Sequence, residues 1–261
     1  MASPREELLA VLRTLKLSAM ASAVEDTALR AAKEGLSHEA FLLELARIER
    51  AAKSARRIER LRTQSELLPD KSFRSLELNR FDAATRMQIE RLRSGGFLTE
   101  AINVVAIGRP GAGKSHVACA LGHALIEQGH PVFFTPTSTL VQRLLAAKRD
   151  LRLPQELAKL DRFECLILDD IGYVQHDRDE MEVLFTLLAE RYERKSVAIT
   201  TNLVFSEWER IFKDPMTTLA AIDRVVHHSV VLDLMAVDSY RAKVAGAKSK
   251  TRKAAEEPAA V

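Results

Sequence analysis

The spacing of hydrophobic positions along the chain changes once, near residue 100. Before that point apolar residues recur with the period of an α-helix, in a stretch rich in the strong helix formers Ala, Leu, Arg and Glu. A first helical stripe comprises Leu8, Leu12, Leu15 and Met20. A second helix is predicted to begin after Ser37 and to continue past Arg60. We therefore predict a small all-helical domain over residues 1–65.

From Ala101 onward, short apolar runs alternate with helical patterns. The predicted strands are Ile102–Ile107, Val132–Thr135, Cys165–Leu168, Val197–Thr200 and Val230–Leu232. Strands that alternate with helices predict a mostly parallel α/β sheet covered on both faces, which makes three layers. We assign this domain to residues 101–244.

The remaining segments differ in composition. Residues 66–100 contain Pro69 and the glycines at 95 and 96, and they are predicted to form a connector with one helix over Ala83–Arg93. Residues 245–261 are rich in Ala and Lys and are predicted to be a disordered tail.

A phosphate-binding loop follows the first predicted strand. The segment from Gly108 to Ser115 fits the pattern G-x-x-x-x-G-K-S/T, with a strand before it and a helix after it. Its glycines let successive backbone N–H groups turn toward phosphate oxygens, and the helix N-terminus adds a partial positive charge. The residues predicted to bind ATP are Gly108, Arg109, Pro110, Gly111, Ala112, Gly113, Lys114 and Ser115. Lys114 is expected to reach the β- and γ-phosphates, and the Ser115 hydroxyl to bind Mg²⁺.

Carboxylates and an amide end two later strands of the predicted sheet. Asp169 would hold Mg²⁺ beside the phosphate loop, and Asp170, one residue further along the pleat, would polarise an attacking water. An acid-rich turn after a strand is the alternative. Asn202 follows the strand Val197–Thr200 and could touch the γ-phosphate or that water; an asparagine in an ordinary strand-ending turn is the alternative.

Composition narrows the class of protein. Apolar residues make up 47% of the chain, enough for a globular core, and a net charge of +3 is too small to indicate an acidic partner by itself. The two cysteines lie in apolar stretches and favour a reducing compartment. The N-terminus lacks the apolar core of a secretory signal, and no run approaches the roughly 18 apolar residues of a membrane span. We expect a cytoplasmic protein without a membrane partner.

Longer segments of the chain are similar to one family. These are GRPGAGKSHVA at the phosphate loop, LILDD at the acidic strand end, RYERKSVAITTNLVFSEWERIF, AAIDRVVHH and the terminal SYR. The first two motifs occur in many ATPases, whereas the others together are more specific. From about Leu8 to Lys243 the chain resembles the IstB-like transposition helper proteins, which are related to DnaC-type helicase loaders in the AAA+ class of ATPases.

This resemblance implies an AAA+ P-loop NTPase fold with a central five-stranded parallel sheet. It also implies a homo-oligomer whose ATP sites lie at subunit interfaces. Asn202 matches the family's sensor position. Arg224 matches the arginine finger, which would act on the ATP of a neighbouring subunit; a solvated helix residue is the alternative. Arg241 also aligns, without a defined role.

The second predicted helix carries a basic stripe. Arg50, Lys53, Arg57 and Arg60 fall within an arc of about 80°, opposite an apolar face. Such a stripe suits the phosphates of double-stranded DNA, and the alternative is a solvated face. Aromatic residues make up only 5% of the chain, which does not favour stacking on single strands.

Three functions fit these features. The first is an ATP-dependent DNA-binding transposition helper that self-assembles on duplex DNA, selects or remodels the target and recruits a cognate transposase, with ATP hydrolysis regulating the assembly. The second is a DnaC-like replicative helicase loader, whose N-terminal domain would grip a helicase. The third is a metabolic P-loop kinase. The paired acids Asp169 and Asp170, together with Asn202, favour water as the phosphoryl acceptor over a metabolite, which argues for the first two.

Overall fold

The chain folds into two units. The structure, a computed structural model, describes residues 3–173, 178–208 and 215–239. The first unit ends at Arg60 and the second begins at Leu61. The segment 66–100, expected from the sequence as a connector, therefore belongs to the second unit. Arg241 and the predicted tail lie outside the described residues.

The first unit consists of helices, as predicted. They are α1 (Pro4–Thr14), α2 (Ser18–Glu34) and α3 (His38–Gln64), whose last turn already belongs to the second unit. Its buried core comprises Leu12, Ala21, Val24 and Leu45. The apolar stripe from Leu8 to Met20 does not form one helix, because the backbone turns at Lys16 with a φ of 56° and separates α1 from α2.

The second unit is built on the predicted five-stranded parallel sheet. Its strands are β1 (Asn103–Ile107), β2 (Val132–Pro136), β3 (Cys165–Asp169), β4 (Ser196–Thr201) and β5 (Ser229–Asp233). They pair in the order β2-β3-β4-β1-β5, and every pairing is parallel. All residues of β1 and β4 are buried, because helices cover both faces of the sheet.

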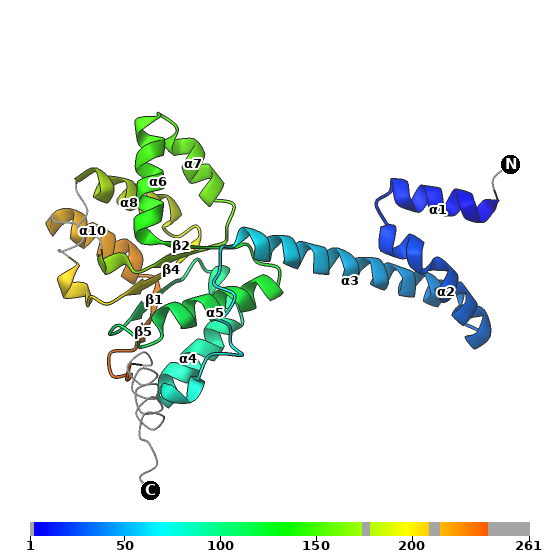
Figure 1. Cartoon of the computed structure of the whole chain (residues 1–261), viewed down its shortest axis with the longest axis horizontal. Helices are drawn as coiled ribbons and strands as arrows, with labels where there is room; N and C mark the ends of the chain where they lie inside the picture. Colours follow the sequence, from blue (N-terminus) through cyan, green and yellow to red (C-terminus); the bar gives the residue numbers. More distant parts are fainter. Residues whose placement is uncertain (1–2, 174–177, 209–214, 240–261) are drawn as a thin grey trace, which may run out of the picture. The chain divides into compact units, whose positions relative to one another are not determined.

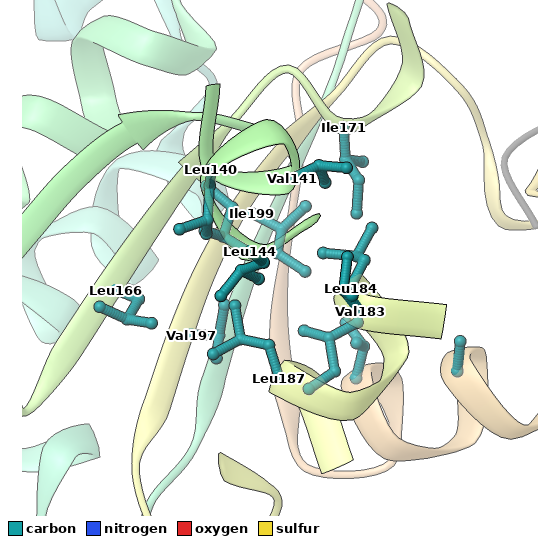
Figure 2. Close-up of a cluster of buried hydrophobic side chains, with 14 of the residues drawn as sticks. Leu140, Val141, Leu144, Leu166, Ile171, Val183, Leu184, Leu187, Val197 and Ile199 are labelled. Atoms are coloured by element: carbon teal, nitrogen blue, oxygen red, sulfur yellow. The ribbon is translucent and has the colours of Figure 1, made fainter. Parts of the chain in front are cut away.

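Helices form the two outer layers of this unit (Figure 1). One layer contains α6 (Thr137–Arg149), α7 (Leu153–Leu160), α8 (Arg178–Arg191) and α10 (Pro215–Val226); the other contains α4 (Ala83–Arg93) and α5 (Lys114–Glu127). Figure 2 shows the core between the first layer and the sheet. There, Leu144 of α6 and Leu187 of α8 pack with Leu166 and Val197 of the strands.

Residues 61–100 contribute apolar side chains to the core of this unit, and those of α4, Ile89 and Leu92, lie on one face of the helix. The buried ones are Leu61, Leu67, Phe81, Ile89, Leu92 and Phe97. The Phe134 N–H of edge strand β2 also donates to the Ser65 carbonyl over 2.7 Å, which covers part of that sheet edge.

No helix among the described residues has both the length and the apolar content to cross a membrane.

Arg191 is a buried cation that joins three elements at the amino ends of the strands. Its side chain is 2% exposed and donates to the carbonyls of Leu160, Phe163, Glu164 and Ser196 over 3.0–3.4 Å. Burial lowers the pKa of the guanidinium to about 10. We expect Arg191→Ala to lower the free energy of unfolding by about 3 kcal/mol, because it leaves these carbonyls buried without their donor.

Chemical denaturation of the two variants Arg191→Ala and Arg194→Ala tests this expectation. The Arg194 side chain is 57% exposed, so its removal should change stability by about 0.5 kcal/mol or less. Equal effects of the two substitutions would contradict the structural role of Arg191.

Candidate nucleotide site

The phosphate loop connects the end of β1 to the start of α5. Gly111 and Gly113 adopt left-handed φ values of 86° and 102°, which glycine tolerates without strain. Space is also restricted, since a Cβ on Gly111 would lie 2.2 Å from Ser239 Oγ. Gly113 occupies the N-cap of α5 and supplies no side-chain cap, so the first backbone N–H groups of the helix remain suited to an anion.

A cavity of about 400 Å³ opens beside this loop. Its wall includes Pro110, Gly111, Gly113, Lys114 and Ser115 from the loop. The Lys114 ammonium donates to the carbonyls of Gly108 and Arg109 over 2.8 and 3.2 Å. The glycine cradle, the helix N-terminus and the lysine together form a site for a polyphosphate.

Residues 70–80 form a second wall, which the sequence did not reveal. The residues of this segment that line the cavity are Asp70, Lys71, Ser75, Leu76, Glu77 and Arg80. His116, directly after the loop, joins the two walls: its Nε2 lies 3.1 Å from Ser75 Oγ and 3.2 Å from the Ser72 carbonyl oxygen. Burial lowers the pKa of His116, which favours its neutral form. No motif or hydrophobic period marks this segment, apart from its density of charged residues.

The two acids at the end of β3 lie in different surroundings. Asp170 lines the cavity, with a left-handed φ of 64° that turns the chain out of the strand. Asp169 is not part of the cavity wall; its Oδ1 accepts a hydrogen bond of 2.6 Å from Thr200 Oγ1 of the neighbouring strand β4. The structure thus brings Asp170, Lys114 and Ser115 to one cavity. Asp169 does not line this cavity and is hydrogen-bonded to Thr200 instead.

Asn202 lies beside the same strand end. A Cβ on Gly172 would lie 2.4 Å from Asn202 Oδ1, so the amide packs against the backbone two residues after Asp170. This buried oxygen has no hydrogen-bond partner among the described residues. Asn202 does not line the cavity itself.

Arg224 is remote from the phosphate loop of its own chain. It lies near the end of α10, where its backbone carbonyl accepts a 3.4 Å hydrogen bond from Asn103 Nδ2 at the start of β1. The phosphate loop follows the other end of β1, and this strand spans roughly 13 Å at about 3.3 Å per residue. The Arg224 guanidinium packs over the ring of Phe185, 4.6 Å from its centroid.

The basic stripe lies on α3 in the first unit. Arg50, Lys53, Arg57 and Arg60 are all exposed. Lys53 has a weak ion pair, with its Nζ 3.9 Å from Oε1 of the buried Glu49. Arg56, outside the stripe, holds the same carboxylate more closely at 3.1 Å, and its other terminal nitrogen donates to Ser18 Oγ of α2 over 3.1 Å, which links α3 to α2.

Comparisons with known proteins agree with this geometry. A family model described as IstB-like ATP binding protein matches residues 10–248. The chain belongs to this family. An insertion-sequence ATP-binding protein of Sinorhizobium fredii (y4iQ/y4nD/y4sD) is 42% identical over 90% of this chain and 79% of that protein. The IS21 ATP-binding protein of Pseudomonas aeruginosa is 34% identical over 91% of this chain and 89% of that protein.

Solved structures identify the fold of this IstB-like protein. DnaA from Aquifex aeolicus with bound AMPPCP superposes with a TM-score of 0.56 at 14% identity, over 72% of this chain and 56% of that chain. DnaI superposes with a TM-score of 0.54 at 13% identity, over 65% of this chain and 95% of that chain. The chain is therefore an ATP-binding AAA+ P-loop NTPase.

Proposed function

We propose that this protein is an ATP-dependent DNA-binding transposition helper. It assembles on duplex DNA as an oligomer with ATP at subunit interfaces, selects or remodels the target and recruits the transposase of its insertion sequence. The observation that carries the proposal is the incomplete ATP site: the loop, Lys114 and Asp170 share one cavity, whereas Arg224 lies at the opposite end of β1. The names of its relatives, ATP-binding proteins of insertion sequences, support the link to transposition.

Within the ATP site, each side chain has a role suited to its position. Lys114 neutralises the β- and γ-phosphates, while the amides of the loop bind their oxygens. Asp170, in the cavity wall, takes the proton of the attacking water, and Asn202 orients that water or the γ-phosphate. Arg224 of a neighbouring subunit stabilises the charge that develops during transfer.

The oxygen donors of the site fit Mg²⁺. Ser115 lines the cavity, and Asp169 lies at the end of β3, one residue before Asp170 of the cavity wall. Mg²⁺ prefers oxygen ligands and keeps several waters, so Asp169 would hold it without lining the cavity itself. When bound, the ion would neutralise charge on the phosphate oxygens.

The stripe on α3 supplies the contacts to DNA. Four cations per subunit give weak binding at physiological salt, but an oligomer aligns many stripes along one duplex and gains avidity without new kinds of contact. DNA binding should therefore require ATP, be cooperative and depend little on base sequence.

A salt titration of duplex binding in the presence of ATP tests this function. The logarithm of the binding constant should fall by about 0.9 per neutralised phosphate for each decade of salt. The variant with alanine at all four stripe positions, Arg50, Lys53, Arg57 and Arg60, should bind every duplex more weakly and with a flatter slope. Its ATP hydrolysis without DNA should match the parent protein.

A control with the same loss of charge carries alanine at four other exposed basic positions of the first unit, none of them on α3, namely Arg5, Arg13, Lys16 and Lys33. This control should keep most of the salt dependence of the parent's DNA binding, because these residues lie off the stripe. If the stripe variant and the parent bind DNA equally, the stripe is a solvated or protein-binding face. A helicase-loading role would then account better for the first unit.

A further inference from the structure

The hydroxyl of Thr200 lies between the two acids that end β3. Thr200 is 1% exposed in β4, and its Oγ1 donates to Asp169 Oδ1 over 2.6 Å. The same Oγ1 accepts the backbone N–H of Asp170 over 2.9 Å. A hydroxyl can donate one hydrogen bond and accept others, so both contacts form at once.

These contacts lie just beyond the last backbone pair of the two strands. The β3–β4 ladder ends with Leu168 opposite Ile199. After it, Asp170 enters the left-handed region and its N–H leaves the ladder. Here the Thr200 hydroxyl, in place of a backbone carbonyl of β4, accepts the Asp170 N–H. This hydrogen bond stabilises the bend that places Asp170 in the cavity wall.

Two buried threonines hold Asp169, one through its backbone and one through its side chain. The Thr137 hydroxyl donates to the Asp169 carbonyl over 3.0 Å, so the backbone of Asp169 is fixed from the β2 side. The Asp169 carboxylate, in contrast, is held from the β4 side by Thr200. Thr200 is therefore the side chain that orients the carboxylate assigned above to Mg²⁺.

We infer that Thr200 is a positioning residue for ATP hydrolysis, which sets the Asp169 carboxylate toward the metal and the Asp170 carboxylate toward the attacking water through one hydroxyl. This role rests on the ATPase mechanism proposed above. It also connects the two acids to β4, whose last residue, Thr201, directly precedes Asn202.

Thr201 provides a matched control in the same strand. It is 0% exposed, and among the described residues its hydroxyl hydrogen-bonds only to the backbone of Leu203, at 3.0 Å from the nitrogen and 3.3 Å from the carbonyl oxygen. A substitution here removes a buried hydroxyl from β4 without touching either acid. It separates a loss of packing from a loss of acid positioning.

The test combines turnover with the affinity for AMPPCP, measured by calorimetry with Mg²⁺ and with a chelator in its place. Thr200→Val should lower kcat by about 10²-fold, the scale of a displacement of about 1 Å in a catalytic group. Its affinity without Mg²⁺ should match the parent, whereas the gain in affinity on adding Mg²⁺ should shrink. Thr200→Ser should restore both properties, and Thr201→Val should keep both.

The role is overturned if Thr200→Val keeps the parent's kcat and Mg²⁺ response, or if Thr201→Val loses as much as Thr200→Val. Thr200→Ala covers the case in which the valine variant does not fold, since it removes the hydroxyl without placing a methyl group against the carboxylate. The Thr200→Ala variant should show both the lower kcat and the smaller gain in AMPPCP affinity with Mg²⁺. A fully active Thr200→Ala protein would also overturn the role. The proposed mechanism fails separately, if Asp170→Asn leaves the rate of hydrolysis unchanged.

Discussion

Replacing Arg224 with alanine is expected to slow ATP hydrolysis by about 10³–10⁵-fold, the contribution that arginine fingers make in other phosphoryl-transfer proteins. ATP should still bind, because Arg224 lies at the opposite end of β1 from the loop that holds the nucleotide in the same chain. In the proposed oligomer, Arg224 acts on the ATP of a neighbouring subunit. The measurement is turnover of the assembled protein, alongside a separate titration of ATP affinity.

Mixing subunits decides whether this arginine acts between chains. Arg224→Ala subunits retain an intact loop, and Lys114→Ala subunits retain an intact finger, so a mixed oligomer contains some complete interfaces. Part of the lost activity should return when the two inactive variants are combined. If the mixture co-assembles and stays inactive, Arg224 does not act in trans. Arg194→Ala, which removes an exposed arginine, should behave like the parent alone and in mixtures.

The sheet was predictable from the sequence because both of its faces are covered. Full coverage requires continuous apolar runs, such as the one before Gly108, and the position of each run marks a strand. The phosphate loop was predictable for a different reason: its backbone conformations at Gly111 and Gly113 are local and demand particular residues. The break at Lys16 carries no such signal, since lysine has no preference for a left-handed backbone.

The missed parts of the site depend on contacts between distant segments. Residues 70–80 line the nucleotide cavity because their packing and the His116 contacts bring them there, and neither follows from a local pattern. Thr200 is similar: it stands 31 residues after Asp169, and only the pairing of β3 with β4 brings the two together. Threonine is also common in buried strands for its β-propensity alone, so the sequence around Thr200 does not indicate a role in positioning the acids.

Asp170→Asn should bind ATP yet lose about 10²–10⁴ in turnover, the usual contribution of a general base. Asparagine is nearly the same shape as aspartate but cannot accept a proton at neutral pH. It also tolerates the left-handed φ of 64° at this position as well as aspartate does, so the backbone and its hydrogen bond to Thr200 should persist. The lost rate would then report the carboxylate alone.

Asp70→Asn is the matched control for this variant. Asp70 lines the same cavity from the wall formed by residues 70–80, so its substitution removes the same charge from the site without removing the proposed base. We expect Asp70→Asn to hydrolyse ATP at close to the parent rate. Normal hydrolysis by Asp170→Asn would show that another group activates the water, and equal losses in the two variants would show that cavity charge matters more than proton transfer. If hydrolysis regulates an ATP-dependent assembly on DNA, as proposed above, an ATP-bound Asp170→Asn protein should also stay on duplex DNA.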